Sequence, residues 1–151
     1  SEFWRDVRPH LYQSCPLILT LTVGAEEGLG GAGGQGDWDG GLYRIKAAQK
    51  DPVYQQVMAM EDWGVIPNAE PQDAFFARVR RGLERIAMAH RDQQVAVFVH
   101  GGVISAALSI ATGATPFAFL GAANGSISRL VITPDRMVVR GFNDVSHLAG
   151  L

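Results

Sequence analysis

The stretch VAVFVHGGVISAALSIATG, residues 95–113, decides the fold class of this 151-residue chain. Its first five residues are apolar and rich in valine, which is typical of a strand buried on both faces of a parallel sheet. The run from 102 to 112 is apolar enough for a buried helix, and Gly113 is suited to end it as a C-cap. The stretch therefore predicts a central strand followed at once by a helix.

The neighbouring segments extend this pattern. Residues 72–90 place six apolar side chains on one helical face, with arginines opposite: Phe75, Phe76, Val79, Leu83, Ile86 and Ala87. Residues 126–133 and 137–142 have strand patterns and flank a Pro-Asp turn, which indicates a hairpin. This order predicts one domain over residues 1–151 with an α/β fold, a three-layer sandwich whose mostly parallel central sheet carries helices on both faces.

Composition excludes several classes of protein. A hydrophobic fraction of 47% and a charged fraction of 19% are those of a soluble globular protein. The formal charge of −2 gives no field for gripping nucleic acid or an anionic membrane, so we expect neither as a partner. The single cysteine, Cys15, allows no intrachain disulfide, and no apolar run is long enough to span a bilayer. We therefore expect a cytoplasmic protein.

The glycine-rich segment 24–41 invites two further readings. It contains Gly28-x-Gly30-x-x-Gly33, but a dinucleotide-binding fingerprint requires a helix at its last glycine, and none is predicted there. Two carboxylates beside a tryptophan, in the turn GDWDG at 36–40, make a poor metal site without a histidine in register. We expect a loop here, and neither a metal nor a cofactor.

His100 stands where an open α/β sheet binds ligands, at the carboxyl end of a strand. Gly101 and Gly102 would let the backbone turn sharply and approach a ligand closely. The helix that follows offers unpaired N–H groups and the positive end of its dipole to an anion. The alternative is a structural histidine that donates to a carbonyl.

Motifs spread over residues 36–148 resemble those of the histidine phosphatase superfamily, the phosphoglycerate mutase-like proteins. His-Gly-Gly after a strand is similar to the second histidine motif of that family. Four other segments also match motifs of the family, and all five occur along the chain in the family's order: GDWDG (36–40), AEPQDAFFARV (69–79), NGSISRLVI (124–132) and GFNDVSHL (141–148). The resemblance implies a site for a small phosphorylated molecule or phosphate, with His100 catalytic and Gly101, Gly102 and Asn124 binding the substrate.

One motif of the family is missing. Its nucleophilic histidine belongs to an Arg-His-Gly motif after the first strand, and these 151 residues contain no Arg-His-Gly. In one alignment LILTLTVGAEEG is the first strand, with Thr22-Val23-Gly24 in the motif's place. In the other, which we prefer, YQSCPLILTLTV matches the family's Ser-Pro-Leu-x-Arg-Thr segment and the first strand is absent. The N-terminal part is then degenerate or truncated.

The proton donor of the family also has no glutamate at its usual place in this chain. The family's glutamate falls at Ala32, so Glu27 in the glycine-rich loop is the candidate catalytic acid, with two solvated loop acids, Glu26 and Glu27, as the alternative. We expect His147 to be structural. Two functions remain open: a phosphatase of doubtful activity acting on a small phosphomonoester, and a non-catalytic binding or interaction relative. The sequence leaves a homodimer open as well as a monomer.

Overall fold

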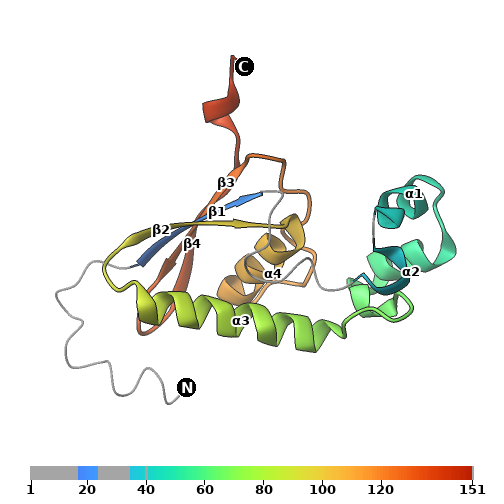
Figure 1. Ribbon diagram of the computed structural model, residues 1–151, viewed down its shortest axis with the longest axis horizontal. Helices are drawn as coiled ribbons and strands as arrows, with labels where there is room; N and C mark the ends of the chain where they lie inside the picture. The colour runs from blue at the N-terminus through green and yellow to red at the C-terminus, as the bar shows by residue number, and fades with distance from the viewer. Residues whose placement is uncertain (1–16, 24–34, 40, 151) are drawn as a thin grey trace.

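The computed structural model describes residues 17–23, 35–39 and 41–150, and Figure 1 shows their arrangement. Its strands are β1 (Leu17–Val23), β2 (Gln94–Val99), β3 (Ile127–Ile132) and β4 (Met137–Asp144). Its α-helices are α1 (Leu42–Ala48), α2 (Pro52–Met60), α3 (Gln72–Ala89) and α4 (Gly101–Thr112). Three short 3-10 helices complete it: η3 (Gly36–Trp38), η4 (Trp63–Val65) and η5 (Ser146–Leu148). The expected helix at 72–90, helix at 102–112 and hairpin are confirmed.

The four described strands form one mixed sheet in the order β2-β1-β3-β4. Only β1 and β2 are parallel, since β3 pairs antiparallel with both β1 and β4. The expected α/β class is confirmed, but a mostly parallel sheet is not what these strands form. Two of the connections are responsible: the hairpin forces β3 and β4 to be antiparallel, and β3 returns beside β1 in the opposite direction.

β2 is an edge strand of the described sheet, so the prediction of a central strand is wrong. Its burial alternates, with Val99 buried and Phe98 59% exposed. The apolar run did not reveal this, because Phe98 and Ala96 are apolar residues that lie on the face opposite the helices. An exposed phenylalanine is indistinguishable in sequence from a buried one.

The register of β1 bears on the two alignments of the N-terminal segment. β1 runs parallel to β2 and pairs Val23 with Val99, so both strands end at the same edge. This position favours the alignment in which residues 17–23 are the first strand over the alignment we preferred. Which residues stand in the place of the family's Arg-His-Gly stays a prediction.

Helices α3 and α4 pack together on one face of the sheet (Figure 1). The main core joins buried residues of α3, α4, β2 and β3, among them Phe75, Leu83, Ile104, Val99 and Leu130. In the described part of the chain, helices cover this face only, so the expected second helical layer is not formed there.

Helices α1 and α2 lie beyond the end of the sheet, at the right in Figure 1, around a smaller core. That core consists of Trp38, Val57 and Ile66. Trp63 packs against both cores and so connects the two parts of the fold. Among the described residues, no helix is long and apolar enough to cross a membrane.

Candidate functional site

The candidate site begins where β2 ends and α4 starts. His100 is the N-cap residue of α4 and has extended backbone angles, φ −73° and ψ 153°. Its carbonyl oxygen accepts the N–H groups of Val103 at 2.9 Å and Ile104 at 3.2 Å. The first N–H groups of a helix have no acceptor within the helix, so those of Gly101 and Gly102 remain available to a ligand. His100 itself is half-buried.

Of Gly101 and Gly102, only Gly102 is sterically required, and the reason is packing. Neither has a positive φ, so the chain turns here without any conformation that is restricted to glycine. A Cβ on Gly102 would lie only 3.3 Å from Cη2 of Trp63, whereas a Cβ on Gly101 would lie 3.9 Å from the carbonyl oxygen of Ala122. Gly102 therefore makes room for the Trp63 ring beside the helix N-terminus.

A cavity of about 380 Å³ opens at this point. Its volume is within the range of small-molecule sites, about 300–1,000 Å³. It is lined by Gln35, Tyr43, Tyr54, Met58, Trp63, Phe75, Gly101, Gly102, Leu120, Gly121 and Ala122. The helix N-terminus thus meets a wall of aromatic and apolar side chains. That the His100 ring also reaches this cavity stays a prediction.

The aromatic side chains of the cavity pack on one another and, for Trp63, also on Phe117 outside the lining. The ring centroids of Trp63 and Phe117 are 4.5 Å apart, those of Trp63 and Phe75 are 5.9 Å apart, and those of Tyr43 and Tyr54 are 5.6 Å apart. Burial raises the pKa of Tyr43 above its ordinary value of 10.0, and a hydrogen bond with Trp63 opposes this rise in part. The Tyr43 hydroxyl is therefore neutral at physiological pH.

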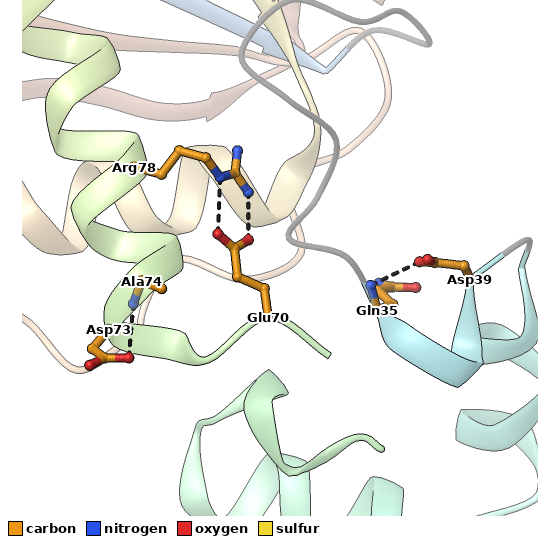
Figure 2. Close-up of polar contacts among 6 residues, drawn as sticks. All are labelled: Gln35, Asp39, Glu70, Asp73, Ala74 and Arg78. Carbon is orange, nitrogen blue, oxygen red and sulfur yellow. Dashed lines mark hydrogen bonds and ion pairs between the residues drawn. The ribbon is translucent and has the colours of Figure 1, made fainter. Parts of the chain in front are cut away.

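Glu70 and Arg78 form a two-point ion pair, which Figure 2 shows. Nε of Arg78 donates to Oε1 of Glu70 at 3.1 Å, and the terminal nitrogen Nη2 donates to Oε2 at 2.7 Å. This pairing raises the pKa of Arg78. The guanidinium carbon also lies 5.2 Å from the ring centroid of Phe75, a residue of the cavity wall. The pair fixes the start of α3, where the sequence alone indicated only an acid near a helix N-terminus.

The GDWDG turn is structural in the described chain. Gly36 has a φ of +56°, and a Cβ on it would lie 2.2 Å from the carbonyl oxygen of Pro67. Asp37 accepts the side-chain amide of Asn68 at 2.9 Å, and Asp39 accepts the backbone N–H of Gln35 at 2.8 Å (Figure 2). These carboxylates are used in holding the turn. Among the described residues, no group of three His, Cys, Asp or Glu could hold a metal ion.

The other candidate residues are less directly placed. Asn124 is exposed in the turn before β3, and the segment contributes Ala122 to the cavity instead. Its role in binding stays a prediction. Glu27 lies outside the described residues. The sequence did not single out Tyr43, Tyr54 or Met58, because side chains on two short helices after a glycine-rich loop carry no pattern that points to a distant strand end.

Comparison with known proteins places this geometry in a family. The model of the histidine phosphatase superfamily (branch 1) matches residues 33–145. The metal-independent phosphoserine phosphatase of Arabidopsis thaliana is 30% identical over 113 residues, which are 74% of this chain and 47% of that protein. The chain thus spans about half the length of the curated relative that it matches.

Two solved structures share the fold. Phosphoglycerate mutase from Bacillus anthracis matches with a TM-score of 0.58 and 21% identity, over 76% of this chain and 57% of that one. An Escherichia coli protein to which an alpha-ribazole-5′-P phosphatase activity is ascribed matches with a TM-score of 0.56 and 20% identity, over 95% of this chain and 80% of that one. On the match over residues 33–145, this chain belongs to the histidine phosphatase superfamily, branch 1.

Proposed function

We propose that this chain binds a small phosphomonoester, with the phosphoryl group at the N-terminus of α4 and the ester group in the adjoining cavity. The observation that carries the proposal is that Gly101 and Gly102, the first two residues of α4, line the cavity. Their N–H groups and the helix dipole favour an anion at that end. His100, directly before them, would donate a hydrogen bond or a proton to a phosphoryl oxygen.

Membership of the superfamily and the names of its relatives support a phosphatase site. The relative from Arabidopsis thaliana is named as a phosphatase that needs no metal. A site without metal is consistent with the described residues around the cavity, whose polar groups are two tyrosine hydroxyls, one amide, the indole N–H of Trp63 and backbone groups. The proposal therefore includes no metal and no cofactor.

A second candidate, binding with little or no turnover, is favoured by the residues at the end of β1. Phosphohistidine chemistry requires an imidazole whose nitrogen is in line with the scissile P–O bond. The strand beside β2 ends in Thr22-Val23, and neither side chain can form a phosphohistidine. General acid–base help from His100 alone is typically worth about 10²–10⁴-fold. The hydrolysis of phosphate monoesters requires far larger accelerations.

One set of measurements on the 151-residue chain tests both candidates. Binding of inorganic phosphate is measured by calorimetry for the parent chain, His100→Ala and His147→Ala, an exposed histidine that serves as the control. Loss of binding in His100→Ala alone supports the site. No phosphate binding by the parent chain, or equal loss in both variants, overturns it.

Turnover separates the two candidates. We expect p-nitrophenyl phosphate to be hydrolysed poorly between pH 5 and pH 8, with no phosphohistidine trapped. Robust turnover that His100→Ala abolishes and His147→Ala preserves would contradict binding without turnover, and would mean either that His100 is sufficient or that another residue of the chain is the nucleophile.

A further inference from the structure

We infer that the cavity selects phosphomonoesters whose alcohol part is a flat apolar ring, and that α1 and α2 supply this selectivity through Tyr43, Tyr54 and Met58. The inference rests on the proposed function for the position of the phosphoryl group. It goes beyond it by naming the chemical class of the ester.

The chemistry of the cavity wall favours a ring in the ester. The cavity contains the rings of Tyr43, Tyr54, Trp63 and Phe75, and its lining among the described residues includes no Asp, Glu, Lys or Arg. Flat aromatic side chains favour a flat apolar partner, through offset stacking or edge-to-face contact in addition to the removal of apolar surface from water. A ring in the substrate is the group that this wall accommodates best.

The aromatic wall of the cavity is held in place before any ligand binds. Trp63 lies between Gly102 and the ring of Phe117, with 4.5 Å between the two ring centroids. The backbone N–H of Phe117 is in turn anchored at 2.8 Å by the carboxylate of Glu61, at the end of α2. Because few side chains have to be ordered on binding, little affinity is lost to conformational entropy.

The cavity is less suited to a zwitterionic ester than to an ester with an apolar ring. The serine part of phosphoserine, the substrate in the name of the Arabidopsis thaliana relative, carries an ammonium and a carboxylate group. Burying either charge without a charged or strongly hydrogen-bonding partner is costly. Besides its backbone groups, the described lining offers the Gln35 amide, the hydroxyls of Tyr43 and Tyr54 and the indole N–H of Trp63, all of them uncharged. We therefore expect a cavity that disfavours an amino-acid phosphate.

The test compares three ligands that have no ester bond to hydrolyse, two phosphonates and inorganic phosphate, with one phosphomonoester, O-phospho-L-serine. Binding of phenylphosphonate, methylphosphonate, inorganic phosphate and O-phospho-L-serine to the full chain is measured by isothermal titration calorimetry. Phenylphosphonate should bind at least about tenfold more tightly than methylphosphonate, because its ring is buried against the aromatic wall. O-phospho-L-serine should bind no more tightly than methylphosphonate.

Two methionines of α2 provide a matched pair of variants. Met58 lines the cavity and is 39% exposed, whereas Met60 does not line it and is 64% exposed. Since neither is in a buried core, both alanine variants should fold, which thermal unfolding verifies. Met58→Ala should lower the preference for phenylphosphonate over methylphosphonate by about two- to fivefold, and Met60→Ala should leave it unchanged.

The outcomes separate the two proposals. If inorganic phosphate and methylphosphonate bind but phenylphosphonate binds no better, or O-phospho-L-serine binds most tightly, the ring selectivity is overturned and the phosphoryl site stands. If none of the four ligands binds, both are overturned. An equal loss of preference in the two methionine variants would contradict the assignment of selectivity to the cavity face of α2.

Discussion

The ring of Trp63 lies against Gly102 so closely that a Cβ at position 102 would be 3.3 Å from Cη2 of the tryptophan. This contact joins the first turn of α4, which is the candidate phosphoryl site, to the aromatic wall of the cavity. It also explains why only the second of two adjacent helical glycines is sterically constrained.

Replacing these glycines in turn tests that relationship. Gly101→Ala should stabilise the chain by about 0.4–1 kcal/mol, because alanine restricts the unfolded chain and Gly101 has a helical conformation with space for a Cβ. The free energy of unfolding of Gly102→Ala should be lower than that of Gly101→Ala by about 1–3 kcal/mol, which is the usual cost of overpacking. Denaturant unfolding measures both. Equal free energies of unfolding would mean that Trp63 moves aside without cost.

The turn at Gly36 should tolerate substitution even less. Both Gly36 and Gly41 have positive φ, +56° and +95°, but a Cβ on Gly41 has nothing within 4 Å. Gly41→Ala should therefore lower the free energy of unfolding only by the cost of the left-handed conformation, about 1–2 kcal/mol. Gly36→Ala should lower the free energy of unfolding by about 1–3 kcal/mol more, because its Cβ would collide with the backbone at Pro67. Thermal unfolding of the two variants would contradict the assigned contact if their losses were the same.

The ion pair of Glu70 and Arg78 should be energetically coupled. In a double-mutant cycle with Glu70→Gln and Arg78→Gln, we expect a coupling energy of about 0.5–1 kcal/mol, as for well-oriented pairs that are only partly exposed. Their side chains are 24% and 29% exposed, so added salt should reduce the coupling only in part. Urea unfolding at low and at high salt gives the coupling energy under each condition. A coupling of zero would show that the two-point geometry contributes nothing.

Asp51 should make the stability of α2 depend on acid pH. Its carboxylate accepts Nζ of Lys46 at 2.8 Å and caps α2 by accepting the N–H of Val53 at 2.9 Å. The bond from Lys46, followed by that from Val53, holds the pKa of Asp51 below its ordinary value of 3.8. A lowered pKa in the folded state stabilises above the unfolded-state pKa, and the contribution disappears as the pH falls through the folded-state pKa.

Asp51→Asn is the matched variant, because an asparagine still caps the helix but does not titrate. We expect the parent chain to be more stable than this variant at pH 6 and the difference to shrink as the pH is lowered from 5 toward 3. Thermal unfolding over that range measures it. A difference that grew on acidification would contradict the lowered pKa.

Much of the local structure could be predicted from the sequence, because each prediction depended on neighbours in the chain. The period of the apolar residues in α3 identified its buried face, where Phe75, Val79 and Leu83 are indeed buried. Gly113 does cap α4 in a left-handed conformation, with a φ of 71°. The hairpin of β3 and β4 followed from its turn residues.

The candidate site could be predicted only in part. The order strand, His100, glycine pair, helix was readable, because a helix N-terminus at a strand end is a local arrangement. The pairing of Glu70 with Arg78 was present as a spacing, but an interval of eight residues specifies a contact only once the chain before α3 has turned back. The aromatic wall had no such signal, since Tyr43 and Trp63 reach the cavity from segments far from His100 in sequence.

The sequence by itself indicated the helices α3 and α4, the strands β2, β3 and β4, and the buried face of α3. Only the tertiary structure decided that β2 is an edge strand of the described sheet, that β1 lies beside it with Val23 opposite Val99, and that Trp63 closes on Gly102. The physical reason is that apolar runs and periodicities record whether a residue prefers burial, whereas strand order and cavity walls depend on which distant surfaces supply that burial.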